Sequence, residues 1–357
     1  MKSTPVILRE GKYSGTSLRT WIRAHKPRET NDIFELQTKE LFEIRHPSLK
    51  SDKVTYKRAE KAFVASRTSQ PAHGDWIFFP WSGVLVHAVT KKEYYEIRTN
   101  RNRNLITTEE QTILALATIG VAGLSVGSNI ATGMLYQGIG ATFRIAEFDR
   151  LETANLNRIR AGMPEIGKKK LDVLTQTMYE VDPYVRIEEF PKGLTQANLS
   201  KFIGTTRPLS ILVDEIDDFE MKIRMRFAAR KARIPVLMFA NVADKVILDV
   251  ERYDKEPNRP IFHGILGTIP DELLKGKVLT DSEKHQYAVL FVGKENVSAR
   301  ALASVAEIGK TLTGRPQLAA TVTVSGGIAT YLARKILLDD NLPSGRQVVS
   351  FSDFEPK

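Results

Sequence analysis

The sequence predicts an α/β protein built on a doubly wound, mainly parallel sheet. Two observations lead to this fold class. From Gln111 onward, short apolar runs alternate with segments of helical periodicity, and a glycine-containing turn, Gly123–Ser128, separates the first apolar run from the first helical segment. Strands separated by helices form right-handed βαβ units, in which neighbouring strands run parallel.

Each expected element is a stretch of regular hydrophobic pattern between turn residues. Within Lys168–Val181, for example, Leu171, Leu174 and Met178 recur at helical spacing. The expected helices are Val126–Tyr136, Lys168–Val181, Phe219–Lys231 and Ala319–Leu338. The expected strands are Thr112–Val121, Phe143–Glu147, Val185–Phe190, Ser210–Asp214, Pro235–Ala240 and Val246–Val250.

The segment Gln111–Phe143 contains no charged residue, which is also a property of membrane spans. A spanning helix needs roughly 20 predominantly apolar residues, whereas six glycines and several polar residues interrupt this segment. We therefore expect a strand, a helix and a second strand here, all buried. Because Met1–Val6 has no apolar stretch of the signal-peptide kind, we expect no membrane association and a cytoplasmic location.

Length and composition are those of an ordinary globular protein. The chain has 357 residues, of which 42% are hydrophobic and 26% charged, so it can bury a sizeable core. It contains no cysteine, which excludes disulfides, thiolate metal sites, iron–sulfur clusters and a thioester carried by this chain.

Basic residues are concentrated in the first third of the chain. The formal net charge is +10, and Met1–Glu110 carries 20 basic and 13 acidic residues against 32 and 29 in Gln111–Lys357. This excess favours an anionic partner such as a nucleotide or RNA, or it is simply a solvated surface. We expect no nucleic-acid partner, although the charge leaves one open.

The turn Gly123-Leu-Ser125-Val-Gly127-Ser128 has the composition of a phosphate-binding loop. Glycines let the backbone approach a phosphate, and the N-terminus of the following helix offers free N–H groups and a favourable dipole. The turn lacks the full G-x-G-x-x-G spacing. Its glycines alone therefore do not identify the ligand.

Three interpretations of this turn stay open on its own residues. The first is a dinucleotide-binding oxidoreductase, in which Glu147 or Asp149 on the next strand binds the ribose. The second is an α/β-hydrolase, because the turn also has the G-x-S-x-G pattern, with Ser125 as nucleophile and His263 or His285 as base. The third is a tight turn without a ligand.

Residues further along the chain favour a site that cleaves ATP. Arg158 and Lys170 would neutralise phosphate charge, and Asp217 follows a later strand, where its carboxylate could hold Mg²⁺. Hydride transfer needs none of these three side chains.

In their order along the chain, these motifs resemble the ThiF/MoeB/HesA superfamily, the ubiquitin-activating-type adenylyltransferases. The motifs lie within about Arg98–Asp254 and are Gly-Leu-Ser-Val-Gly-Ser, Glu-Phe-Asp, Asn-Leu-Asn-Arg, Ile-Gly-Lys-Lys-Lys, Val-Asp-Glu-Ile-Asp-Asp and Ile-Pro-Val-Leu-Met. The runs Trp76–His87 and Arg98–Arg103 look like those of a bacterial branch that is often fused to a nitroreductase-like domain.

The resemblance implies a Rossmann-like, ThiF-type ATP-binding fold with three parts. Residues 1–95 would form a small N-terminal accessory region, in which Trp76–His87 predicts a strand pair around a Pro/Gly turn. Residues 96–255 would form the nucleotide-binding core. Residues 256–357 would complete the same domain.

The resemblance also implies a set of ATP-binding residues. Gly123, Ser125 and Gly127 match the nucleotide loop, and Glu147 stands where the family has an Asp that binds the ribose hydroxyls. The other expected members bind phosphates or belong to the Mg²⁺ site: Asp149, Asn155, Arg158, Lys170 and, as the Mg²⁺ ligand, Asp217. Arg101 matches an arginine that reaches into the partner subunit's site, which implies a homodimer.

The implied reaction joins a carboxylate to ATP–Mg²⁺ and gives an acyl-adenylate and pyrophosphate, with Arg158, Lys170, Asp217 and Arg101 as the catalytic residues. The carboxylate would be the C-terminus of a ubiquitin-like protein, a sulfur carrier or a peptide, a small acid, or a modified tRNA. Without cysteine, we expect neither an internal thioester nor a zinc site. An NAD(P)-binding oxidoreductase and a non-catalytic nucleotide-binding module remain the alternatives.

Overall fold

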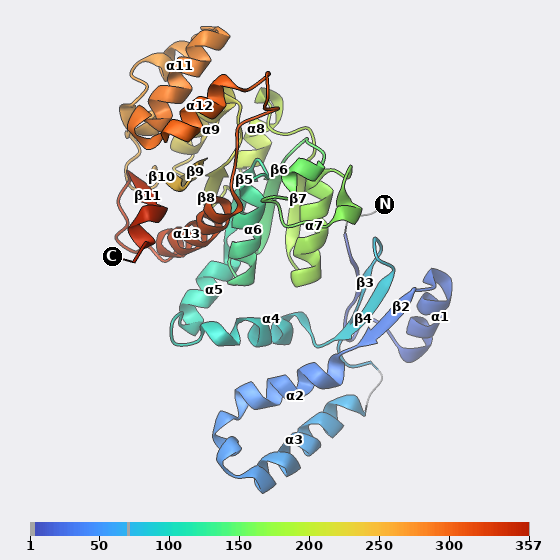
Figure 1. Cartoon of the computed structure of the whole chain (residues 1–357). Coiled ribbons are helices and arrows are strands. Elements are labelled where there is room, and N and C mark those ends of the chain that lie inside the picture. The colour runs from blue at the N-terminus through green and yellow to red at the C-terminus, as the bar shows by residue number, and fades with distance from the viewer. Residues whose placement is uncertain (1–3, 70–71, 357) are drawn as a thin grey trace. The chain divides into compact units, whose positions relative to one another are not determined.

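The computed structural model describes residues 4–69 and 72–356, with the side chains of Asp281 and His285 left out. The chain divides into two compact units (Figure 1). Unit 1 comprises Met1–Glu109 and Thr175–Tyr184, and unit 2 comprises Glu110–Leu174 and Val185–Lys357. The predicted domain limits at 95 and 255 stay predictions.

Unit 2 is built on a seven-stranded sheet with the order β11-β10-β9-β8-β5-β6-β7. From β9 to β7 all neighbours are parallel, whereas β10 pairs antiparallel with both β9 and β11. The mainly parallel sheet confirms the predicted fold class. The strands are β5 (Thr118–Ala122), β6 (Thr142–Ala146), β7 (Arg186–Phe190), β8 (Ile211–Asp214), β9 (Val236–Val242), β10 (Lys245–Glu251) and β11 (Gly345–Ser350).

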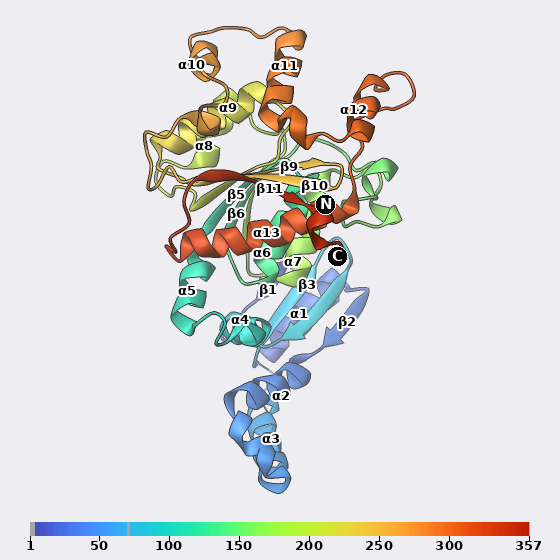
Figure 2. The same ribbon diagram turned by 60° about the vertical axis from the view of Figure 1, so that its left-hand side comes forward.

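Helices cover both faces of this sheet, as doubly wound folds require. Figure 2 shows α6 (Gly127–Tyr136) and α13 (Ala319–Leu337) on one face, with α8 (Gln196–Ile203) and α9 (Phe219–Lys231) on the other. The loops that leave the carboxyl ends of β5, β6 and β8 meet at one edge of the sheet, the usual place for ligands in such folds.

Helices α6 and α13 pack closely because small residues face each other. A Cβ on Gly133 would lie 2.7 Å from the Thr330 hydroxyl oxygen, and one on Gly326 would lie 3.1 Å from the Asn129 carbonyl oxygen. The helix that begins at the glycine-containing turn is therefore braced along its length by α13.

The predicted strand Thr112–Val121 is wrong in its first half. The chain instead forms α5 (Thr108–Leu116) and then β5. The expectation that this whole segment is buried is also wrong, because Ile113 and Leu116 on α5 are 51% and 74% exposed. A short uncharged apolar run fits a helix or a strand equally well, so the pattern could not separate them.

The other helices and strands predicted from Val126 onward are present with small shifts at their ends. Helix α9 has the predicted bounds, and the helix predicted from Lys168 begins at Lys170 as α7 (Lys170–Val181). The sequence did not predict α8 or β11. Both elements are short, and β11 is also partly exposed. Between β10 and α13 lie η5 (Ile261–Gly264), α10 (Ile269–Leu274), α11 (Asp281–Val292), η6 (Lys294–Asn296) and α12 (Ala299–Ala306).

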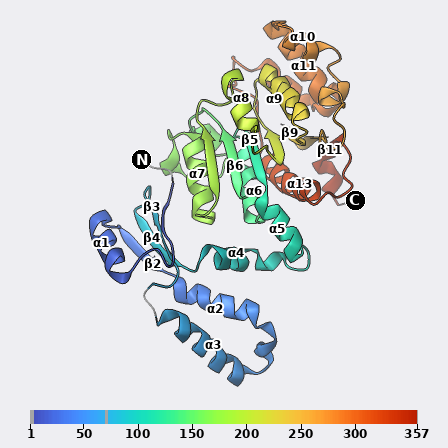
Figure 3. The same ribbon diagram turned by 180° about the vertical axis from the view of Figure 1, so that it is seen from behind.

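Unit 1 has its own four-stranded sheet, ordered β1-β3-β4-β2. The predicted strand pair in Trp76–His87 is confirmed as β3 (Asp75–Phe79) and β4 (Val84–Ala88), which pair antiparallel. Figure 3 shows α1 (Gly15–His25), β2 (Glu29–Asp32), α2 (Phe34–Arg45), α3 (Lys53–Thr68) and α4 (Lys91–Thr99) from behind. The remaining elements of unit 1 are β1 (Val6–Leu8), η1 (Pro47–Ser51) and η2 (Asn100–Asn102).

Among the described residues, no helix combines the length and the apolar character needed to span a membrane.

Candidate functional site

The turn between β5 and α6 requires glycine at its first position. Gly123 has φ +87°, and a Cβ there would lie 2.3 Å from the backbone carbonyl oxygen of Glu215. Its N–H donates to the carbonyl of Ala146 at the end of β6 over 3.0 Å. Gly123 thus lets the loops after β5, β6 and β8 approach one another at the carboxyl edge.

The same turn offers unpaired backbone donors in front of α6. Across the described residues, the N–H groups of Ser125 and Val126 donate to no protein acceptor. The first turn of a helix leaves N–H groups unpaired, and the positive end of the helix dipole favours an anion there. This end of α6 can therefore bind a phosphate.

Glu147, at the end of β6, fixes the shape of this turn. The residue is buried, with 7% of its surface exposed. One carboxylate oxygen accepts the N–H of Leu124 over 3.0 Å, and the other accepts those of Phe148 and Asp149 over 2.7 and 2.9 Å. The carboxylate predicted to bind ribose therefore also ties β6 to the nucleotide loop.

Arg158 joins the loop after β6 to the nucleotide loop. Its Nε donates to the hydroxyl oxygen of Ser125 over 2.8 Å, and its Nη1 donates to Asn157 Oδ1 over 2.9 Å. The Asn129 side chain of α6 donates to the Arg158 carbonyl over 3.2 Å. Burial lowers the pKa of Arg158 from its ordinary value, and the charge of Asp217 opposes this shift.

Asn155 and Lys170 flank the loop that carries Arg158. Asn155 is buried in η3 (Thr153–Asn155), and its side-chain oxygen accepts the N–H of Glu152 over 3.1 Å. The Lys170 ammonium, at the start of α7, donates to Asp149 Oδ2 over 2.8 Å. Lys170 is 9% exposed at its side chain and Asp149 is 49% exposed, so the pair faces solvent on the side of Asp149.

Two neighbouring aspartates at the end of β8 have different roles. Asp218 is the N-cap of α9, where its side chain accepts the N–H of Met221 over 3.0 Å. Asp217 points outward with its side chain 93% exposed, and it pairs with Arg315 over 3.5 Å. Asp217 is therefore the one of the two whose carboxylate is available to a ligand.

A buried ionic network connects the carboxyl end of β8 to α9 and β10. Asp214 accepts from Lys222 Nζ over 3.1 Å and from Arg226, and Arg226 Nε donates to Glu251 over 2.6 Å. The side chains of Asp214, Arg226 and Glu251 are fully buried. Burial opposes ionisation of Asp214, yet the charges of Lys222 and Arg226 hold the pKa of this carboxyl below its ordinary value.

The sequence did not predict the part that residues 314–318 play in this site. Gln317 accepts a hydrogen bond from the Ser125 hydroxyl over 3.3 Å, and its carbonyl accepts one from the Asn157 side chain over 2.8 Å. Arg315 pairs with Asp217. The segment was visible in sequence only as a Gly/Pro turn, because its site partners lie more than 90 positions earlier in the chain.

The site residues fit a magnesium ion that arrives with a nucleotide. Among the described residues, no group of three or more His, Asp or Glu side chains could hold a metal by itself. Mg²⁺ is commonly bound through one or two carboxylates plus substrate phosphates. The exposed carboxylate of Asp217 is a suitable ligand of that kind.

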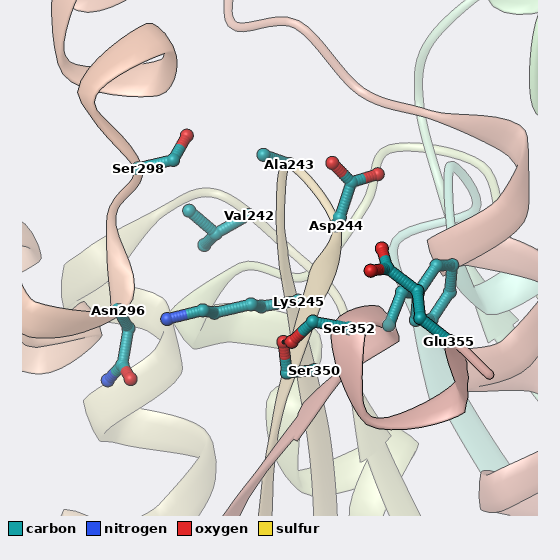
Figure 4. A pocket seen from close by; sticks show the side chains of 10 residues that line it. Val242, Ala243, Asp244, Lys245, Asn296, Ser298, Ser350, Ser352 and Glu355 are labelled. Carbon is teal, nitrogen blue, oxygen red and sulfur yellow. Dashed lines mark hydrogen bonds between the residues drawn. The ribbon is translucent and has the colours of Figure 1, made fainter. Parts of the chain in front are cut away.

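A polar pocket of about 400 Å³ lies beside the turn between β9 and β10 (Figure 4). Its lining includes Asp244, Lys245, Asn296, Ser350 and Glu355, and Figure 4 shows the Lys245 side chain extended toward Asn296. Because β9 runs parallel to β8, this turn lies at the same edge of the sheet as Asp217.

The structure gives no support to the hydrolase interpretation. The hydroxyl of Ser125 accepts a hydrogen bond from Arg158 and donates one to Gln317. Both ring nitrogens of His263 are hydrogen-bonded, one to Asp249 and the other to Arg259. The other candidate base, His285, has its side chain outside the described part of the chain.

Unit 2 brings nine of the ten predicted site residues to one edge of its sheet. These are Gly123, Ser125, Gly127, Glu147, Asp149, Asn155, Arg158, Lys170 and Asp217. The tenth, Arg101, lies in unit 1 on η2, where its side chain is exposed. Its predicted role in a partner's site stays a prediction.

Comparison with known proteins identifies the family. The model of the ThiF family matches residues 99–354, which is well over half of the chain. The chain belongs to the ThiF family. This confirms the resemblance found in the motifs, and it extends the match beyond Asp254 to the C-terminal part.

Relatives of this ThiF-family chain include proteins of different lengths. "Uncharacterized protein MT1398" of Mycobacterium tuberculosis is 37% identical over 277 residues, covering 78% of this chain and 38% of that protein. Ubiquitin-like modifier-activating enzyme 5 of Drosophila virilis is 29% identical over 33% of this chain and 31% of the enzyme. The sulfur carrier protein adenylyltransferase of Thermus thermophilus is 26% identical over 56% of this chain and 72% of the enzyme. The chain thus spans about a third of the length of the first two relatives.

Solved structures share the fold of this ThiF-family chain. PaaA superposes with a TM-score of 0.54 at 20% identity, over 74% of this chain and 80% of PaaA. The tRNA N6-threonylcarbamoyladenosine dehydratase TcdA of E. coli superposes with a TM-score of 0.50 at 18% identity, over 70% of this chain and 98% of TcdA. At these identities the comparison establishes the fold alone.

Proposed function

We propose that this chain is an ATP-dependent adenylyltransferase that converts a carboxylate into an acyl-adenylate and releases pyrophosphate. One observation carries the proposal: a half-buried arginine, Arg158, lies against the glycine-containing turn of α6, while the exposed carboxylate of Asp217 stands across from it. Together they place a cation, unpaired backbone donors and an exposed carboxylate at one edge of a parallel sheet. Backbone donors at a helix N-terminus commonly bind phosphates, and a carboxylate commonly binds the Mg²⁺ that accompanies them.

The residues of the site would act by positioning and by charge. ATP with Mg²⁺, when bound, supplies the electrophilic α-phosphorus and the pyrophosphate leaving group. The N–H groups of Ser125 and Val126 would donate to phosphate oxygens. Arg158 and Lys170 would stabilise negative charge as it gathers on the phosphates, and Asp217 would hold the metal. The attacking oxygen is already anionic, so the chain needs no general base.

The finer parts of the proposal are the metal, the substrate and the subunit arrangement. Mg²⁺ at Asp217 and a homodimer with Arg101 in the partner's site are proposed from the family motifs. A cytoplasmic location is proposed because the lack of cysteine fits a reducing compartment. The names of the relatives from Drosophila virilis and Thermus thermophilus support a ubiquitin-like or sulfur-carrier C-terminus as the carboxylate. Without cysteine, the acyl group would pass directly to its acceptor.

The test is calorimetric titration of the purified chain with ATP–Mg²⁺. Arg158→Ala and Asp217→Asn are each expected to weaken ATP binding by about tenfold or more, because hydrogen bonds between charged groups are the strong ones. Matched controls are Arg160→Ala, an exposed arginine in the same loop, and Glu220→Gln, an exposed acid in the first turn of α9. Both controls should bind as the wild type does.

Pyrophosphate exchange then tests the chemistry. Exchange of labelled pyrophosphate into ATP in the presence of the carboxylate, lost in Arg158→Ala, is the expected result. Tight binding of ATP without exchange with any carboxylate would favour a non-catalytic nucleotide-binding module. Preferential binding of NADH would favour the oxidoreductase and contradict the proposal.

A further inference from the structure

Residues 314–318, which we call the strap, are the last part of the connection from α12 to α13 and contact three loops of the site. Figure 2 shows this connection running from α12 to α13. Gln317 is hydrogen-bonded to Ser125 in the nucleotide loop and to Asn157 in the loop after β6. Arg315 is paired with Asp217 in the loop after β8. A segment distant in sequence thus lies against the three loops that form the candidate site.

The strap is held firmly at its C-terminal end. Leu318 is the N-cap residue of α13, and α13 packs along α6 through Gly133 and Gly326. Pro316 fixes one backbone angle between Arg315 and Gln317. The strap therefore keeps Arg315 beside the loop after β8 through contacts made within unit 2.

The ion pair between Arg315 and Asp217 is exposed, so a competing ligand can replace either partner. The two side chains are 66% and 93% exposed. Exposed ion pairs contribute little to stability, so a stronger partner can displace Asp217 from Arg315 at little cost. A phosphate is such a partner, because a guanidinium binds two phosphate oxygens at once.

Asp217 interacts with two arginines of the site. Arg315 pairs with this carboxylate on one side, and the charge of Asp217 also acts on Arg158. Glu215 and Asp218 add further carboxyl groups nearby. A metal bound at Asp217 would add positive charge there and would compete with Arg315 for this carboxylate.

We propose that Arg315 is a phosphate-binding residue of the nucleotide site, carried there by the strap, and that it binds the phosphates beyond the α-phosphate. The inference rests on the proposed adenylyltransferase function. Asp217 is the proposed ligand of the metal that accompanies the triphosphate, so the side chain paired with Asp217 stands next to the triphosphate and not next to the adenosine. Gln317 is a positioning residue, which keeps the strap against Ser125 and Asn157.

The test measures nucleotide binding by calorimetry with the full chain. Arg315→Ala is expected to weaken ATP–Mg²⁺ binding about tenfold and AMP binding less than about twofold, because AMP lacks the phosphates that Arg315 contacts. Arg315→Lys should recover part of the affinity, since a lysine keeps the charge but loses the two-point contact. Gln317→Ala should weaken ATP binding by a few fold. Arg300→Ala, an exposed arginine on α12, is the matched control and should bind as the wild type does.

Two results would overturn the inference. One is wild-type affinity for ATP in Arg315→Ala. The other is an equal loss for ATP and AMP with an unchanged thermal midpoint, which would mean that Arg315 does not distinguish the outer phosphates. If Arg158→Ala weakens ATP binding while Arg315→Ala does not, this inference alone fails. If the wild type binds no ATP, the proposed function fails with it.

Discussion

The guanidinium Nε of Arg158 donates to the hydroxyl oxygen of Ser125 over 2.8 Å, and the same hydroxyl donates to Gln317 over 3.3 Å. Three segments far apart in the sequence are thereby connected through one serine side chain. These are the loop after β6, the turn before α6 and the strap.

Ser125→Ala should weaken ATP binding by several fold and leave pyrophosphate exchange detectable. The change removes the acceptor that positions Arg158, but it removes no charge from the site. Titration with ATP–Mg²⁺ and the pyrophosphate-exchange rate check this expectation. Complete loss of an esterase activity in Ser125→Ala would instead make Ser125 a nucleophile and contradict the site described above.

Gly123→Ala should destabilise the fold by about 2–4 kcal/mol, because it adds backbone strain and a close contact with the Glu215 carbonyl oxygen. Gly309→Ala separates the two effects. Gly309 has φ +81°, but a Cβ added there would meet no atom within 4 Å, so only strain of about 1 kcal/mol is expected. Urea denaturation of both variants measures the difference, and equal losses would show that the approach of Glu215 is unimportant.

Lys222→Met should shift the acid-side loss of stability to higher pH. The folded-state pKa of Asp214 is below its ordinary value of 3.8, so its ionisation stabilises the fold above that value. This contribution is lost as the pH falls through the lower folded-state pKa. Lys222 is one of the two cations that lower this pKa. Without it, the stability contributed by Asp214 should begin to fall at a higher pH.

The measurement for Lys222→Met is the free energy of unfolding between about pH 2 and pH 7, the range over which a paired carboxylate loses its contribution. Lys231→Met, an exposed lysine at the end of the same helix, is the matched control and should follow the wild-type curve. A Lys222→Met curve parallel to the wild-type curve at every pH would contradict the expectation.

Lys170→Met should weaken ATP binding about tenfold and AMP binding much less, because the ammonium is expected to neutralise the triphosphate. In the structure this ammonium is held by Asp149 over 2.8 Å. Lys168→Met is the control, since Lys168 is exposed two positions earlier. Equal ATP affinity in Lys170→Met and Lys168→Met would remove Lys170 from the site.

Much of the fold could be predicted because its elements carry their own pattern. The predicted bounds of α9 are those observed, and the helix of the nucleotide loop begins one residue later than expected. The segment Thr112–Leu116 was predicted wrongly because its uncharged apolar residues suit a strand as well as a helix, and its exposed face could not be recognised from the sequence.

By itself, the sequence determined the family, the parallel sheet and the residue types of the nucleotide loop. Glycine spacing and hydrophobic period are local properties, and the ordered motifs required no contacts to be recognised. The tertiary structure decided which side chains meet. It gave the carboxylate of Glu147 three backbone donors, placed Asp217 outward while Asp218 caps α9, and brought Arg315 and Gln317 to the site. Such contacts depend on how distant segments pack, and no local pattern in the sequence records that packing.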